Sequence, residues 1–145
     1  MPNQPANPET GKIKANTIEE LRYLQQIYQN QYSLVGQEID SRLAALEELG
    51  RSLKTLENAD SVAGKGSLIH VGASVYMTGT ISKAKSVVVG VGAGYLVEKS
   101  VDEAKGYISD INEREVQSIN KLNKTKKDIE SALVEISYKA EEMSH

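Results

Sequence analysis

Apolar side chains recur three and four residues apart along two long segments of the chain, residues 16–57 and 101–143. This spacing places them on one stripe of an α-helix, and a stripe kept for about six heptads is typical of a coiled coil. In the first segment only Gln25 and Arg42 interrupt the stripe. Its a and d positions are Ile18, Leu21, Gln25, Tyr28, Tyr32, Val35, Ile39, Arg42, Leu46, Leu49, Leu53 and Leu56.

In the second segment the a positions are apolar except for one, and the d positions are weaker: Ala104, Ile111, Ser118, Thr125, Ala132 and Lys139. Glu115 is the one charged residue of the a row, Val101, Ile108, Glu115, Leu122, Ile129, Ile136 and Met143. Small d residues such as Ala104 and Ala132 allow a partner helix to approach closely. Each segment begins with a capping-box sequence, at residues 17–20 and 100–103. We expect two long helices that fold back antiparallel.

The segment between them, residues 67–100, is rich in Val, Gly, Ile, Thr and Tyr, which favours strands. Residues 58–66 are expected to form a loop that precedes it. Breaks at residues 72–74, 82–85 and 92–94 predict four short strands, at 68–71, 75–81, 86–90 and 95–98, paired as two hairpins. The run 87–89 is apolar on both faces, so it needs cover on both. We therefore expect other subunits to cover the hairpins through Leu68, Ile69, Val71, Val75, Tyr76, Met77, Ile81, Val87, Val88, Val89, Tyr95, Leu96 and Val97.

Composition agrees with an elongated chain. The 145 residues include no Trp, Phe or Cys, and the net charge is −3. The absence of Cys excludes disulfides and thiolate metal sites, and the small charge does not favour a nucleic-acid partner. The longest apolar run, 87–97, is too short to cross a bilayer as a helix, and the polar N-terminus does not resemble a signal peptide, so we expect a cytoplasmic protein without a membrane partner. Residues 1–15 hold all three prolines and are expected to be a disordered tail that is dispensable for assembly.

No motif in the chain favours an enzyme or a cofactor. The glycines of residues 90–94 resemble a dinucleotide loop, but a strand follows where a helix should begin, so a hairpin turn is favoured. His70 and His145 are isolated and give no metal-ligand spacing. The basic run 121–127 is expected to form a solvated helix face. No nucleophilic side chain is paired with a base in the sequence. We predict no catalytic, cofactor-binding or metal site.

The hairpin sequences resemble those of one known family. Residues 72–81 (GASVYMTGTI) are similar to the first-hairpin segment of the prefoldin alpha class, and residues 87–100 (VVVGVGAGYLVEKS) closely resemble its second, V-x-V-G-x-G-Y-x-V-E-K. Two coiled-coil helices that flank two hairpins are also the plan of that class, whereas the beta class carries one hairpin. The resemblance covers about residues 17–143 and is specific only in the hairpins.

The resemblance implies an α+β fold: a long antiparallel coiled coil whose two central β-hairpins join an oligomeric β-barrel platform. It implies a heterohexamer of two alpha-type and four beta-type chains that binds non-native proteins without ATP and passes them to a group II chaperonin. Frayed helix ends at the distal tips could present apolar side chains to clients, although closing the coiled-coil seam is the plainer role for most of them. The tip residues are Ile18, Leu21, Leu24, Ile27, Leu133, Val134, Ile136, Tyr138 and Met143.

Two other classes of function remain open from the sequence. The chain could be a structural or scaffolding coiled coil, such as a filament-forming relative of prefoldin that binds no clients. It could also be a nucleic-acid or regulatory binding module that uses the basic run 121–127. A nucleic-acid binder is distinguished by a steep salt dependence, and a client holder by suppression of aggregation without nucleotide.

Overall fold

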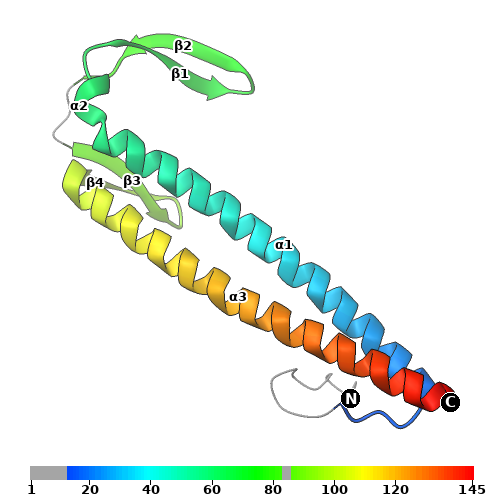
Figure 1. Ribbon diagram of the computed structural model, residues 1–145. Coiled ribbons are helices and arrows are strands. Elements are labelled where there is room, and N and C mark those ends of the chain that lie inside the picture. Colours follow the sequence, from blue (N-terminus) through cyan, green and yellow to red (C-terminus); the bar gives the residue numbers. More distant parts are fainter. Residues whose placement is uncertain (1–12, 83–85) are drawn as a thin grey trace. The chain divides into compact units, whose positions relative to one another are not determined.

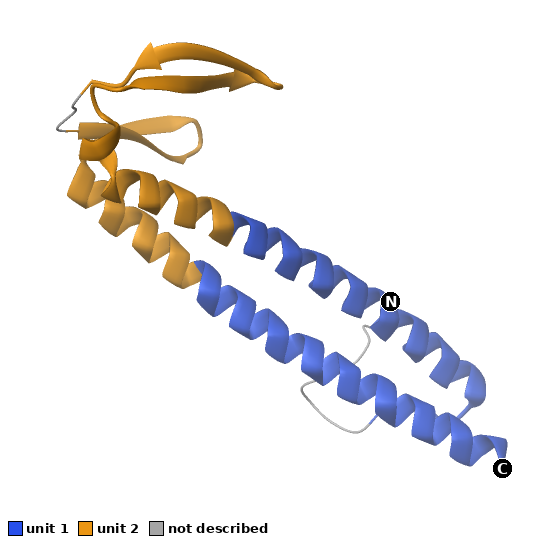
Figure 2. Cartoon of the chain, turned by 45° about the horizontal axis from the view of Figure 1, so that its top comes forward, with its two compact units in different colours: residues 1–45, 115–145 blue, residues 46–114 orange. Residues whose placement is uncertain are grey.

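The computed structural model describes residues 13–82 and 86–145. The elements follow in the order α1 (Ile18–Glu57), α2 (Ala59–Val62), β1 (Gly66–Gly72), β2 (Val75–Thr80), β3 (Ser86–Gly92), β4 (Tyr95–Ser100) and α3 (Val101–Ser144) (Figure 1). The expected order of long helix, two hairpins and long helix is confirmed. The chain divides into two compact units, which we call unit 1 (residues 1–45 and 115–145) and unit 2 (residues 46–114) (Figure 2).

The expected loop at residues 58–66 is wrong in part, because it contains the single turn α2. The backbone N–H groups of Ser61 and Val62 both donate to the carbonyl oxygen of Asn58, at 3.0 and 3.3 Å. Gly64 then takes a φ of 77°, which glycine adopts without steric cost. Local backbone hydrogen bonds of this kind have no strong signal in amino-acid composition, so the composition of these residues predicted a loop.

Both long helices begin where the capping sequences predict. The N–H of Glu20 donates to the hydroxyl oxygen of Thr17 at 3.2 Å, and the N–H of Glu103 donates to that of Ser100 at 3.1 Å. The Glu103 carboxylate accepts the N–H of Ser100 in return, at 3.4 Å. The Glu20 carboxylate instead accepts the N–H of Asn16, one residue earlier, at 2.7 Å. These bonds satisfy backbone donors that have no partner within the helix.

In unit 1, α1 and α3 run antiparallel and share one buried cluster. The hydroxyl of Tyr32 donates to Glu130 at 3.1 Å, whereas Arg42, further along α1, reaches Glu115, which is earlier in α3. This reversed order of partners defines the antiparallel arrangement. The buried cluster consists of Ile13, Ala15, Leu21, Tyr28, Ile129, Ala132 and Ile136. The helical members all belong to the predicted stripes, and the small Ala132 is buried as the d row indicated.

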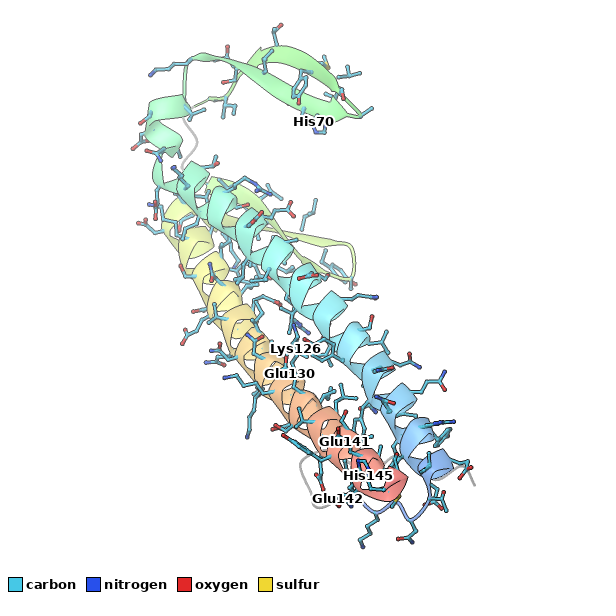
Figure 3. The ribbon with its side chains drawn as sticks, turned by 45° about the vertical axis from the view of Figure 1, so that its right-hand side comes forward. His70, Lys126, Glu130, Glu141, Glu142 and His145 are labelled. Atoms are coloured by element: carbon cyan, nitrogen blue, oxygen red, sulfur yellow. The ribbon has the colours of Figure 1, made fainter. Side chains whose placement is uncertain are left out.

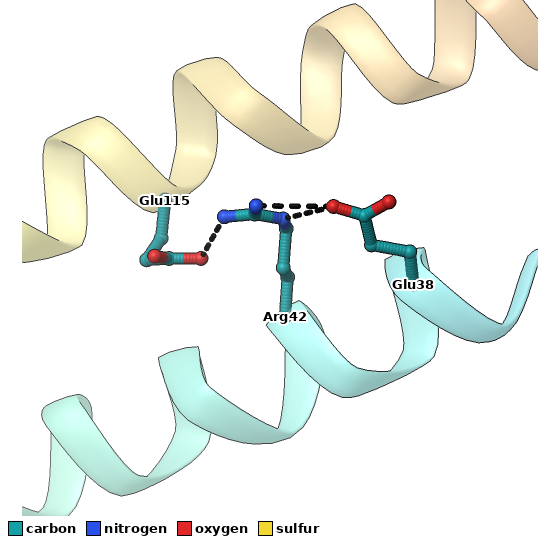
Figure 4. A network of polar contacts seen from close by, with 3 residues as sticks. All are labelled: Glu38, Arg42 and Glu115. Carbon is teal, nitrogen blue, oxygen red and sulfur yellow. Dashed lines mark hydrogen bonds and ion pairs between the residues drawn. The ribbon is translucent and has the colours of Figure 1, made fainter. Parts of the chain in front are cut away.

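The charged residues that interrupt the two stripes pair with each other. One guanidinium nitrogen of Arg42 donates to the Glu115 carboxylate at 3.0 Å, and two others donate to Glu38 of the same helix at 3.1 and 3.2 Å (Figure 4). The hydrogen bond to Glu38, followed by that to Glu115, raises the pKa of Arg42 above its ordinary value. A d-position cation therefore meets an a-position anion across the seam, which favours the register in which they meet.

The segment before α1 differs from the expected tail. Residues 1–12 of that prediction lie outside the described residues. Ile13 and Ala15, however, are only 8% and 6% exposed and belong to the buried cluster of unit 1. Two apolar side chains in a short polar segment carry little weight in a composition count, yet they are enough to anchor it to an apolar surface.

Unit 2 contains two antiparallel hairpins, β1–β2 and β3–β4, as predicted. Each ladder has an irregularity before a two-residue turn, between His70 and Gly72 and between Gly90 and Gly92. In the second turn Ala93 and Gly94 have φ values of 51° and 79°, as a type I′ turn requires. The glycines of residues 90–94 thus belong to a hairpin and not to a dinucleotide loop.

The helical part of unit 2 continues the stripes. Ala104 of the α3 d row is completely buried. The predicted stripe residues at the end of α1, Leu46, Leu49, Leu53 and Leu56, are all half-buried. The apolar side chains of these helices are therefore largely used within the chain.

We predict that the Arg42–Glu115 pair acts as a unit. Glu115→Leu or Arg42→Leu alone leaves a half-buried charge beside an apolar residue, so each should lower the urea midpoint of unfolding. The double variant Arg42→Leu/Glu115→Leu should unfold at a higher urea concentration than either single variant. A double-mutant cycle from urea titrations measures this coupling. Strictly additive effects would contradict the pairing.

Candidate functional site

The first hairpin exposes apolar side chains on both of its faces. Residues directly opposite in an antiparallel ladder point to the same face, so Leu68 lies with Thr78, and Ile69 lies with Met77 on the other face. Leu68 and Met77 are 69% and 61% exposed. A Cβ added at Gly79 lies 2.7 Å from Cδ1 of Ile69, so the absence of a side chain there makes room for Ile69. Among the residues that the structure describes, none covers either face of this hairpin.

His70 is held inside this hairpin and not near a ligand set. Its Nε2 hydrogen-bonds the carbonyl oxygen of Ala73 at 2.9 Å, and its ring centroid lies 5.2 Å from that of Tyr76 across the strands. Figure 3 shows its position on the hairpin. Among residues 13–82 and 86–145, no group of three or more His, Asp or Glu side chains is arranged to hold a metal ion.

The second hairpin has one open face and one that is partly covered. Val88 and Leu96, on the open face, are 65% and 72% exposed. Val87 and Val89 point the other way and are half-buried, and Val87 lines a groove together with Leu56 and Val101. The sequence indicated two faces that need cover, whereas unit 2 itself covers part of one of them.

Together the hairpins expose a large apolar surface. Burying one fully exposed aliphatic side chain stabilises a complex by about 1.5–3 kcal/mol, so even a few of these residues could support a stable interface. The predicted assembly residues that are exposed are Leu68, Ile69, Val71, Val75, Tyr76, Met77, Ile81, Val88, Tyr95, Leu96 and Val97. Only Val87 and Val89 of the predicted set are half-buried.

The predicted tip residues of unit 1 fall into three groups. Leu21 and Ile136 are 1% exposed and belong to the buried cluster. Val134, Tyr138 and Met143 are 55%, 65% and 40% exposed. The remaining four are half-buried: Ile18, Leu24, Ile27 and Leu133. Of the predicted tip residues, only the exposed group and the exposed parts of the half-buried side chains are accessible to another molecule in this structure.

Val134 and Tyr138 of the exposed group border an open groove between α1 and α3 in unit 1. Its apolar lining comes from α3, with Val134 and Tyr138 beside Leu133 and Ala140. On α1 the lining is the amide pair Gln25 and Gln29. Gln25, which interrupts the seam in the sequence, therefore lies in the wall of this groove.

Among the exposed apolar residues of unit 1 that the sequence analysis missed, the two most exposed lie on α1. Tyr23 and Leu34 are each 63% exposed. Both lie on α1 outside the a and d positions, so they point away from the helix stripe. Apolar residues at outer heptad positions are the signal that could have found them, because an outer position faces solvent.

Two tyrosines join the helices of unit 1. Burial raises the pKa of Tyr28, and the negative charge of Glu135 raises it further. The ammonium of Lys126 lies 5.0 Å from the ring centroid of Tyr32, whose hydroxyl donates to Glu130. Figure 3 shows Lys126 and Glu130 one turn apart on α3. One lysine of the basic run 121–127 is thus engaged with an aromatic ring of the other helix.

None of the helices that the structure describes combines the length and apolar content that a bilayer crossing requires.

Comparisons with known proteins agree with this arrangement. The family model of the prefoldin subunit matches residues 28–145. This chain belongs to the prefoldin family. The prefoldin subunit alpha of Thermofilum pendens is 32% identical over 132 residues, which cover 86% of this chain and 92% of that protein. The prefoldin subunit alpha of Pyrococcus horikoshii is 28% identical over 128 residues, which cover 87% and 86%.

A solved structure is also similar. The cryo-EM structure of filamentous PFD from Methanocaldococcus jannaschii matches with a TM-score of 0.55 and 29% identity, over 81% of this chain and 93% of that one. The chain is therefore a prefoldin chaperone subunit, and membership of this family implies assembly with other prefoldin subunits.

We predict that the open face of the second hairpin is required for assembly of this prefoldin subunit. Leu96→Asp should abolish the complex with partner subunits, because it buries an unpaired charge in the interface. Leu96 is exposed in the single chain, so the far-ultraviolet circular dichroism of the variant should be unchanged. Leu34→Asp, an equally drastic change at an exposed position of unit 1, serves as the matched control. Sedimentation of each variant with its partners decides, and a wild-type complex formed by Leu96→Asp would contradict the assignment.

Proposed function

We propose that this chain is the alpha-type subunit of a prefoldin made of two alpha and four beta subunits. In this complex it holds non-native proteins without ATP and passes them to a group II chaperonin. The observation that carries the alpha assignment is the pair of complete hairpins, since the beta class has one. The names of the alpha subunits to which the chain is similar support the same assignment.

The exposure of the hairpins supports the assembly part of the proposal. Leu68 and Tyr95 are 69% and 72% exposed, one on each hairpin. Sheet edges and apolar faces of this kind are a liability for a chain on its own, since unpaired strands invite further pairing. Subunits that add strands to these edges satisfy the backbone groups and cover the side chains together, which favours hairpins over helices as the assembly element.

The groove of unit 1 supports the client-binding part. It places Val134 and Tyr138 at the surface, next to half-buried side chains of the seam. Such a surface is open and built from a few apolar residues, so each contact with a client is weak. Repetition over several subunits then gives useful avidity while allowing release. This combination suits a holder that must hand its client on.

A scaffold that forms filaments is the second candidate. One observation favours it: the similar structure from Methanocaldococcus jannaschii is described as filamentous. The chain alone distinguishes the two, because a filament former polymerises without beta-type partners. Electron microscopy of the isolated chain should show no filaments if the hexamer proposal is right.

We predict that holding depends on the exposed residues of the groove. Val134→Ser/Tyr138→Ser should keep the assembly intact but weaken suppression of aggregation of a chemically denatured test protein, without nucleotide, by about threefold to tenfold for the loss of one or two apolar contacts. The control Val116→Ser changes an exposed apolar residue of α3 that does not line the groove, and should hold normally.

Point variants suit this test better than trimming the helices. Removal of residues 17–27 and 133–145 also deletes Leu21 and Ile136 of the buried cluster. Normal holding by an assembled Val134→Ser/Tyr138→Ser complex, with the exposed tip residues of the partner subunits replaced as well, would place the client surface elsewhere.

A further inference from the structure

Residues 13–15, which lie shortly before α1 begins at Ile18, alternate between buried and exposed. Ile13 and Ala15 are 8% and 6% exposed, whereas Lys14 between them is exposed. Alternation with a period of two is what an extended peptide shows when one side lies on an apolar surface. We call residues 13–15 the strap. Figure 1 shows residues 13–17, in blue, beside the C-terminal end of α3.

The strap is bound by side chains and by its backbone. Its two apolar side chains belong to the same buried cluster as Leu21 and Ile136. The ammonium of Lys139 donates a hydrogen bond to the carbonyl oxygen of Ile13. Lys139 occupies a d position of α3, where a lysine is otherwise out of place, and this bond gives it a partner. Beyond the strap, the N–H of Asn16 is held by the Glu20 carboxylate at 2.7 Å.

These features are those of a peptide-binding site that is already filled. The surface accepts an extended chain and buries one apolar side chain together with a small one two residues later. The ammonium of Lys139 binds the backbone carbonyl oxygen of the first of these residues. Nothing in these contacts requires the peptide to be covalently attached to α1. The backbone carbonyl and the apolar side chains are features that any non-native protein offers.

We propose that the strap occupies, within the chain itself, the site for an extended apolar segment of a non-native protein, and that a client must displace it. This inference rests on the proposed function of client holding. It names the class of ligand for the site: an extended stretch with apolar residues at positions i and i+2, the second of them small. Departure of the strap removes Ile13 and Ala15 from the buried cluster that contains the predicted tip residues Leu21 and Ile136.

Competition within one chain sets the strength of client binding. The apparent dissociation constant equals the intrinsic constant divided by the fraction of chains whose strap is open. A strap that is open about one tenth of the time weakens client binding about tenfold. Tethering keeps the strap at a high effective concentration, so weak contacts suffice to close the site. The strap therefore lowers the affinity of the subunit for its client, and it covers apolar surface when no client is bound.

The test uses the full chain assembled with its partner subunits. Ile13→Ser/Ala15→Ser removes both anchors, and Lys14→Ser changes the exposed residue between them as a matched control. A fluorescent peptide with the sequence of residues 9–17, ETGKIKANT, is the probe. We expect it to bind the double variant at least about tenfold more tightly than it binds the wild type or Lys14→Ser. The same peptide with serine in place of its isoleucine and alanine should not bind.

A second measurement avoids any variant that could unfold the helix ends. The chain contains no cysteine, so Lys14→Cys introduces a unique site for a spin label at an exposed position. Addition of a denatured client should increase the mobility of the label if the strap is displaced. Unchanged mobility of the label at saturating client would overturn the proposal. Equal peptide binding to the wild type and the double variant, or binding to neither, would also overturn it.

The outcomes also separate this inference from the proposed function. If the wild-type complex suppresses aggregation while the mobility of the label stays unchanged, the strap is a structural cap and client holding stands. If no version of the assembled complex suppresses aggregation, the proposed function fails, whereas tighter binding of the peptide by the double variant still reports a displaceable strap.

Discussion

Two helices that pack mainly against each other can bury only one stripe of side chains each, and this limit governs unit 1 of the chain. Every residue on the stripe must be apolar or must find a polar partner across it. Arg42 and Glu115 meet this requirement together, with Glu38 completing the network. Lys139 meets it through the backbone carbonyl of Ile13. The polar residues of the stripes thus pair at defined points, and each pairing favours one register of α1 against α3.

The same limit explains the exposure of the hairpins. The stripes of α1 and α3 are largely consumed by the helices, so little apolar surface remains to cover β1–β4. Val87 and Val89 obtain partial cover in unit 2, whereas Val88 and Leu96 remain 65% and 72% exposed. An exposed apolar hairpin is tolerable in a subunit whose neighbours complete the fold. Membership of the prefoldin family accounts for an arrangement that is unfavourable for a solitary chain.

The apolar residues at the helix ends of unit 1 are of two kinds: some are exposed in the groove, and others are buried beside the strap. Val134 and Tyr138 are open at the surface. Leu21 and Ile136 are closed by packing in which Ile13 and Ala15 take part. A chaperone subunit needs apolar surface for clients, yet that surface also promotes association with other proteins. A segment that covers part of it reversibly reconciles the two requirements.

Local and periodic features of this protein could be predicted from its sequence alone. Heptad spacing determined both helices, capping sequences determined where they begin, and the Gly-rich breaks determined the hairpins, because these signals act over a few neighbouring residues. Only the tertiary structure showed that Arg42 meets Glu115, that Ile13 and Ala15 are buried, and that Val134 is open while Ile136 is closed. These contacts and burials depend on which residues of one segment lie opposite which residues of a distant segment. The hydrophobic pattern of a single segment does not identify the residues that it contacts.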